Sequence, residues 1–133
     1  MPLGRKVRYG MVGGGPGAFI GEVHRKAAAL DGEIELVAGA FSSDPDKSHQ
    51  QGGELFLDPS RVYGSYQEMI DKENLDIINV ATPDDRHKDI VIDASNSGVK
   101  GIVCEKPMST TVADCDHMIE VCHANGSLLS VDH

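Results

Sequence analysis

Residues 11–21 read Met11-Val12-Gly13-Gly14-Gly15-Pro16-Gly17-Ala18-Phe19-Ile20-Gly21, a glycine-rich turn between two apolar segments. The preceding segment, residues 7–12, is short and apolar like a buried strand, and residues 19–30 repeat apolar side chains at helical spacing. A glycine-rich turn in that strand–helix context is typical of the Gly-x-Gly-x-x-Gly fingerprint that binds dinucleotides. The amides that open such a helix bind phosphate without needing a lysine.

The residues of this turn have separate predicted roles. Gly13 would form the tight turn, and Gly15 would admit the pyrophosphate. Ala18 or Gly21 would allow the helix to pack closely on the strand, and a loop longer than usual leaves this third role open between them. A glycine-rich turn that binds no ligand is the alternative. The predicted cofactor-binding residues in this segment are Gly13, Gly15, Pro16, Gly17, Ala18, Phe19 and Ile20.

Strands and helices alternate along the rest of the chain. We expect strands at residues 7–12, 34–41, 76–81, 101–105 and 128–132, and a weaker strand at 61–63. We expect helices at residues 19–30, after Asp44-Pro45, after Ser65, at 85–97 and at 111–125, the last with Val112, Met118, Ile119 and Cys122 on one side. The alternation predicts an α/β fold: a doubly wound parallel sheet of the Rossmann type, in a single domain, with strand order 3-2-1-4-5-6.

Composition argues against several classes of function. The 133 residues include 12 Lys and Arg against 21 Asp and Glu, a net charge of −9. Nucleic acids and anionic membranes need clustered basic residues, so neither is an expected partner. No apolar run reaches the roughly 18 residues of a membrane span, and no signal-peptide core follows the basic N-terminus, so a cytoplasmic location is expected. Three cysteines without zinc-type spacing predict free thiols and no metal site: Cys104, Cys115 and Cys122.

The end of the second predicted strand bears on the choice of cofactor. Folds that bind NAD commonly place Asp or Glu there for the ribose hydroxyls, whereas this chain has Ser42 and Ser43. Hydroxyl groups do not repel a 2′-phosphate and Lys47 would attract one, so the pattern leans slightly toward NADP over NAD. Asp44 keeps NAD open, because its carboxylate could bind a ribose. Capping of the next helix by these residues is compatible with either cofactor.

Two further strand ends carry candidate residues. Ala81, Thr82 and Pro83 end the strand at 76–81, beside the point where ligands of this fold bind. Helix capping is the alternative role for Thr82, and a structural role is the alternative for His87. Glu105-Lys106-Pro107 ends the strand at 101–105, where the Lys106 ammonium group could stabilise charge on a substrate oxygen or exchange a proton with it. An ordinary turn is the alternative there.

Together these segments resemble the N-terminal half of the glucose–fructose oxidoreductase / inositol dehydrogenase (Gfo/Idh/MocA) family. The resemblance rests on the glycine turn through Val23-His24, Ala81-Thr82-Pro83 with His87, Glu105-Lys106-Pro107 and the closing strand, in that order. It implies an NAD(P)-binding Rossmann domain over residues 1–133, from an oxidoreductase that transfers hydride between the cofactor and a sugar, inositol or related polyol. It also implies that Lys106 is catalytic. The predicted cofactor-binding residues outside the glycine turn are Ser42, Ser43, Lys47, Ala81, Thr82, Pro83, His87, Glu105 and Lys106.

In that family an Asp and a His, the other catalytic residues, lie in a second domain that binds substrate and commonly forms the dimer. The chain ends at His133, where that domain would begin. We therefore expect the cofactor-binding portion, inactive alone, of a homo-oligomeric enzyme. A non-catalytic dinucleotide sensor is the alternative. A methyltransferase ranks last, because it would want an acidic residue ending the second strand and gives Glu105-Lys106-Pro107 no role.

Overall fold

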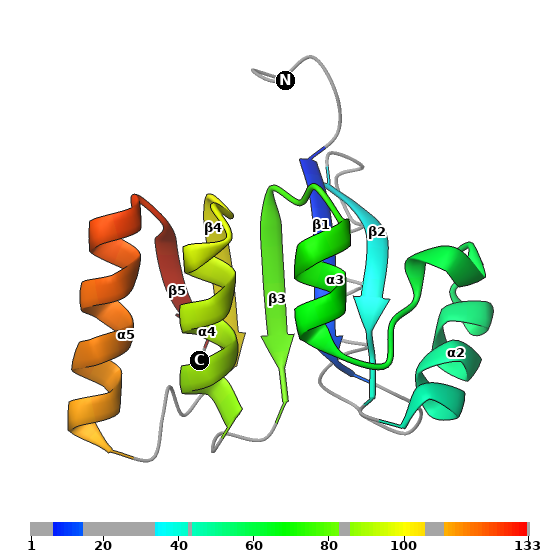
Figure 1. Ribbon diagram of the computed structural model, residues 1–133, viewed down its shortest axis with the longest axis horizontal. Coiled ribbons are helices and arrows are strands. Elements are labelled where there is room, and N and C mark those ends of the chain that lie inside the picture. The colour runs from blue at the N-terminus through cyan, green and yellow to red at the C-terminus, as the bar shows by residue number, and fades with distance from the viewer. Residues whose placement is uncertain (1–6, 15–33, 43, 83–85, 106–110, 133) are drawn as a thin grey trace.

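The computed structural model describes residues 7–14, 34–42, 44–82, 86–105 and 111–132. Their strands form one parallel sheet in the order β2-β1-β3-β4-β5 (Figure 1). These are β1 (Val7–Gly13), β2 (Ile34–Ala40), β3 (Ile77–Ala81), β4 (Gly101–Glu105) and β5 (Leu128–Asp132). The five strong strands expected from the sequence are thus confirmed. Because all neighbouring strands are parallel, their carboxyl ends lie at one edge of the sheet.

The predicted six-strand order 3-2-1-4-5-6 is wrong in one respect, because residues 61–63 do not form a strand. The Asp58 carboxylate accepts a hydrogen bond from the Ser60 amide at 2.9 Å and caps a 3-10 turn, η1 (Pro59–Arg61). The turn includes Arg61, and although Val62 is extended, its pairing with β2 is limited to a single bridge, Val62 to Gly39. This bridge lies beside β2, where the predicted order puts its third strand. No sixth strand is seen in the described part of the chain.

Four helices have described positions: α2 (Pro45–Glu54), α3 (Tyr66–Lys72), α4 (His87–Asn96) and α5 (Val112–Asn125). Two begin at a polar cap expected from the sequence, Asp44 and Ser65, and α5 begins at a cap that was not predicted, Thr111. The side chains of Asp44, Ser65 and Thr111 accept hydrogen bonds from backbone amides of the first turns of α2, α3 and α5. The predicted helix at 19–30 lies outside the described residues.

Helices α3, α4 and α5 lie side by side on one face of the sheet (Figure 1). The main core cluster forms there, where sheet residues such as Ile78 and Ile102 pack with Met69, Ile90 and Met118. Side chains alternate between the two faces of a strand, so Tyr9 and Met11 of β1 face the side opposite Val12. A second cluster forms on that side from Tyr9, Met11, Phe41 and Val62.

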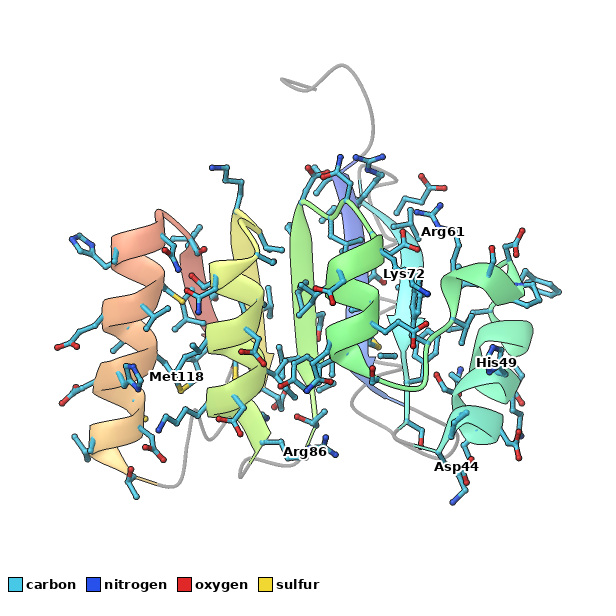
Figure 2. The ribbon with its side chains drawn as sticks, viewed as in Figure 1. Asp44, His49, Arg61, Lys72, Arg86 and Met118 are labelled. Atoms are coloured by element: carbon cyan, nitrogen blue, oxygen red, sulfur yellow. The ribbon has the colours of Figure 1, made fainter. Side chains whose placement is uncertain are left out.

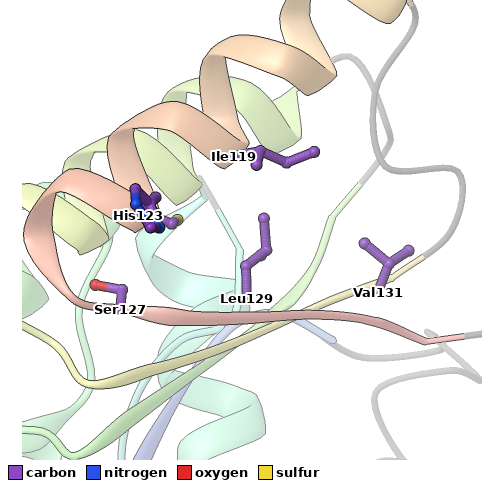
Figure 3. Close-up of a pocket in the computed structure, with 6 residues that line it drawn as sticks. Ile119, His123, Ser127, Leu129 and Val131 are labelled. Atoms are coloured by element: carbon purple, nitrogen blue, oxygen red, sulfur yellow. The ribbon is translucent and has the colours of Figure 1, made fainter.

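The apolar side predicted for α5 is only partly buried. Met118 and Cys122 are buried, but Val112 is 78% exposed and Ile119 is 53% exposed. The reason is the position of α5 above the last strand of the sheet, where it contacts α4 on one flank. Its other flank forms a shallow groove with β5, lined by Ile119 and His123 of the helix and by Leu129 and Val131 of the strand (Figure 3).

None of the helices in the described ranges is long and apolar enough to cross a membrane.

Candidate functional site

The carboxyl ends of β1 and β3 define the candidate site. These strands are neighbours in the sheet but not in the chain, because the chain passes from β1 to β2 on one side and reaches β3 on the other. Ligands of open parallel sheets bind in the crevice at such a reversal, outside the carboxyl ends of the strands. The two ends meet where Gly13 pairs with Ala81.

Gly13 and Gly14 have the conformation that the fingerprint requires. Their φ angles are +85° and +71°, in the left-handed region that favours glycine. A Cβ atom at Gly13 would also lie 2.5 Å from the carbonyl oxygen of Ala81, which is backbone and cannot move aside. Gly13 therefore has the left-handed backbone of a tight turn, and its role toward a cofactor stays a prediction. The rest of the predicted loop, residues 15–20, lies outside the described residues.

Thr82 places a buried hydroxyl group beside this turn. Its Oγ1 atom is buried and has no hydrogen-bond partner within the described structure. Its Cγ2 atom lies 3.0 Å from the position that a Cβ atom at Gly13 would occupy. Helix capping, the alternative predicted for Thr82, is not observed, because α4 has Arg86 at its N-cap and no side-chain capping bond. A buried hydroxyl without a partner costs about 1–3 kcal/mol, so a ligand that hydrogen-bonds it fits this position.

His87 is buried rather than directed to solvent. Its side chain is 1% exposed, and its Nε2 atom lies 2.8 Å from the carbonyl oxygen of Thr82. A carbonyl oxygen only accepts hydrogen bonds, so Nε2 carries the proton and donates it. The structural role that the sequence left open for this histidine is therefore present in the structure. Pro83, predicted beside it, lies outside the described residues.

The end of β2 presents hydroxyl and carboxylate groups near the same edge. Ser42 Oγ accepts a hydrogen bond from the Asp44 amide at 3.1 Å. Asp44 Oδ1 in turn accepts from the Asp46 amide at 3.0 Å, so this carboxylate caps α2 as predicted. Lys47 is exposed. Figure 2 shows Asp44 and Arg86 at the end of the molecule to which the strands point. Ser43 lies outside the described residues.

Glu105 brings the end of β4 to this edge, half-buried, while Lys106 and Pro107 lie outside the described residues. The preceding residue, Cys104, is completely buried, and burial raises the pKa of its thiol to about 12. The thiol is therefore protonated at neutral pH and does not act as a nucleophile. All three cysteines are free. No cluster of three or more His, Cys, Asp or Glu side chains that could hold a metal is found among the residues described.

Asn79 was missed by sequence reasoning. It is 8% exposed on β3, and its Oδ1 atom is a second buried acceptor without a partner in the described ranges. The available signal was an amide within the otherwise apolar segment Ile77-Ile78-Asn79-Val80. The alternation of the strand places it on the face opposite the cluster that contains Ile78 and Val80.

Comparison with known proteins assigns the chain to a family. The pattern of the Gfo/Idh/MocA oxidoreductase family, an NAD-binding Rossmann fold, matches residues 7–133. The chain therefore belongs to this family, as the NAD-binding domain of such an oxidoreductase.

Three relatives illustrate the similarity. The uncharacterized oxidoreductase YfiI of Bacillus subtilis (strain 168) is 31% identical over 98% of this chain and 35% of its own length. A D-xylose 1-dehydrogenase (NADP(+)) from Hypocrea jecorina is 34% identical over 69% of this chain and 23% of its own. An inositol dehydrogenase homolog from Azotobacter vinelandii, solved with NADH and myo-inositol, is 35% identical with a TM-score of 0.90 over 96% of this chain and 35% of its own. The chain thus spans about a third of the length of the curated relatives it matches.

Proposed function

We propose that this chain binds a nicotinamide dinucleotide at the carboxyl ends of β1 and β3 and presents it for hydride transfer. The observation that carries the proposal is the unpartnered, buried Thr82 hydroxyl beside the left-handed turn at Gly13 and Gly14. A buried polar group of this kind gains a partner when a ligand fills the crevice, and the turn brings backbone close to that ligand.

The predicted residues divide into three groups in this proposal. The glycine turn, from Gly13 to Ile20, holds the pyrophosphate through backbone amides. The end of β2 faces the adenosine ribose. Thr82, Pro83 and Glu105 line the side toward the nicotinamide ring. The bound cofactor supplies the hydride chemistry, and the chain binds and orients it.

Lys106 has the catalytic role in this proposal. It directly follows Glu105, the last residue of β4, at the edge where the proposed cofactor lies. An ammonium group there stabilises the charge that develops on a substrate oxygen during hydride transfer, and it exchanges a proton with that oxygen.

The substrate class proposed is a sugar, inositol or related polyol. The support is the Azotobacter vinelandii homolog, whose structure contains myo-inositol together with NADH. Because the relatives are about three times as long, we propose that a second domain of the whole protein binds the substrate and forms the oligomer. In that arrangement the 133-residue chain binds cofactor but does not turn over substrate.

Either NAD(H) or NADP(H) fits the end of β2, and we retain a slight preference for NADP(H). Ser42 presents a hydroxyl group there, and Lys47 is exposed one helical turn further on. One oxygen of Asp44 is used to cap α2, which reduces its availability for a ribose. The relatives include both an NADH complex and an NADP-dependent dehydrogenase.

The experiment is a calorimetric titration of the chain with NAD⁺, NADH, NADP⁺ and NADPH. We expect saturable binding of at least one of the four, and the ratio of affinities gives the cofactor preference. Gly15→Val should abolish binding, because a side chain at this position would occupy the space of the pyrophosphate. Gly53→Val is the matched control, since a Cβ atom at Gly53 meets no other atom within 4 Å. Absence of binding by the unmodified chain, or full binding by Gly15→Val, would contradict the proposal.

A further inference from the structure

His87 is a buried, titratable side chain to which the proposed chemistry assigns no step. It is the first residue of α4, and its imidazole ring is 1% exposed. The ring donates through Nε2 to the carbonyl oxygen of Thr82, at 2.8 Å. This hydrogen bond joins the start of α4 to the residue that directly follows β3.

The bond holds Thr82, whose hydroxyl group has no hydrogen-bond partner in the described part of the candidate site. The Thr82 side chain lies against the turn at Gly13, and its Oγ1 atom is buried. Helix α4 packs on β3 and β4, so a ring anchored on its first residue has a fixed position. A displacement of the Thr82 backbone by about 1 Å would take its hydroxyl out of hydrogen-bond range of a ligand, and misplacements of that size have large effects on function.

We propose that His87 is a positioning residue of the dinucleotide site, which holds the Thr82 backbone so that its hydroxyl group lies where the cofactor binds. The inference rests on the proposed function. It differs from the direct cofactor contact predicted from the sequence, because His87 acts through Thr82. A planar ring that donates through Nε2 suits this role, since it fixes the direction of the carbonyl group.

The experiment is a double-mutant cycle read out as the dissociation constant for NADH and for NADPH. His87→Leu removes the donor at similar volume, and Thr82→Val removes the hydroxyl that the donor positions. We expect His87→Leu to weaken binding about tenfold in the wild-type chain, the worth of one well-placed hydrogen bond. In the Thr82→Val background we expect about twofold or less, since residues that act through one another are not additive.

Rescue distinguishes positioning from mere support of the fold. His87→Gln keeps an N–H donor close to the position of Nε2, so it should bind within about threefold of wild type. His123→Leu is the matched control, because this exposed histidine lies in the last turn of α5, away from the end of β3, and should not alter binding. Urea unfolding checks that each variant is folded. If His87→Leu does not fold, His87→Asn replaces it, because its shorter amide does not reach the Thr82 carbonyl.

The outcomes separate this inference from the proposed function. If the wild-type chain binds neither dinucleotide, the proposed function fails and this inference fails with it. If the wild type binds but His87→Leu binds equally well, only the inference fails. Equal losses from His87→Leu in both backgrounds would also overturn it, since His87 would then act independently of Thr82. The inference is supported if His87→Leu weakens binding only in the chain that keeps Thr82, and if His87→Gln restores the affinity.

Discussion

Thr82 carries a hydroxyl group whose burial is unfavourable without a hydrogen-bond partner. In the described structure Oγ1 has none, so the group weakens folding while it is available to a ligand. Binding and stability therefore respond to its removal in opposite directions.

Thr82→Val tests this separation. A methyl group of similar shape removes the unpartnered hydroxyl, so the free energy of unfolding should stay unchanged or rise by up to about 1 kcal/mol. The affinity for the dinucleotide should fall about five- to tenfold, as for the loss of one hydrogen bond. Urea unfolding and calorimetric titration measure the two quantities. Thr82→Ser keeps the hydroxyl and should keep the affinity. A valine variant that binds as tightly as the wild type would show that the hydroxyl does not contact the cofactor.

Phe56 is a second residue whose local conformation opposes stability. Its φ angle is +60°, the only positive value at a non-glycine residue in the described ranges, and its side chain is 94% exposed. It follows the C-terminus of α2, where the Leu57 amide donates to the Gly52 carbonyl oxygen at 2.9 Å. This is a helix-ending motif in which glycine is usual.

Phe56→Gly should raise the free energy of unfolding. The left-handed conformation costs a non-glycine residue roughly 1–2 kcal/mol, and the greater freedom of glycine in the unfolded chain offsets about half of it. A gain of about 0.5–1 kcal/mol in urea unfolding is expected. Gly126→Ala provides the reverse case, because Gly126 ends α5 at φ +73° with open space around it. It should destabilise by about 1 kcal/mol. A destabilised Phe56→Gly would mean that the exposed ring contributes contacts that outweigh the strain.

At the scale of elements, a partly buried charge network joins Arg61, at the end of η1, to Glu73, which directly follows α3. Arg61 Nη2 donates to Glu73 Oε1 at 2.6 Å, and the Tyr63 hydroxyl donates to Glu73 Oε2 at 2.7 Å. Burial raises the pKa of Glu73, but the hydrogen bonds from Arg61 and Tyr63 outweigh it and leave the pKa below its ordinary value. Burial and the bond to Glu73 raise the pKa of Tyr63 to about 12. Figure 2 shows Arg61 away from the end that carries Asp44 and Arg86.

The network makes stability depend on pH at both extremes. A carboxyl group whose pKa is lowered in the fold stabilises it at pH values above the ordinary pKa of 4.5. That contribution is lost as the pH falls through the lower pKa of the folded state. The raised pKa of Tyr63 stabilises below pH 10 and the effect is lost as the pH rises through about 12. Glu73→Gln should lower the free energy of unfolding at pH 7 by about 1 kcal/mol and flatten its decline toward acid pH. Urea unfolding from pH 7 to pH 3 measures this.

Glu68→Gln is the control for that measurement. Glu68 pairs with Lys72 at 2.9 Å, but both side chains are largely exposed, 49% and 62%. Exposed pairs contribute little, so the acid decline of this variant should follow the wild type. An unchanged acid limb in Glu73→Gln would show that Glu73 is not linked to folding in this range.

The sequence predicted elements well where local signals control them. Asp44 and Ser65 cap the helices that follow them, because capping depends on the next three residues only. The weak strand at 61–63 was wrong, because a turn capped by Asp58 includes Arg61 and leaves only one bridge to β2, at Val62. The exposure of Val112 and Ile119 was not predicted, for a different reason. Helical periodicity identifies an apolar face, but it does not tell which helix lies at the end of a sheet.

At the scale of the whole molecule, the sequence indicated where a candidate site should lie but not its detailed contacts. The turn at Gly13 and the hydroxyl of Thr82 were expected because a fingerprint and a strand end lie in a fixed topological relation. The burial of His87 and the unpartnered amide of Asn79 depend on packing between segments, which residue spacing does not encode. Lys106, the proposed catalytic residue, remains a prediction from sequence.

The groove between α5 and β5 lies at the last strand of the sheet, and within the described ranges that strand has a neighbour on one edge only. Two strands, β3 and β4, separate β5 from β1 and the glycine turn that follows it. A peptide that adds to the sheet there would extend it without touching the nucleotide crevice. The edge is therefore a suitable place to attach a reporter or a tether, because the intervening strands keep it away from the proposed cofactor site.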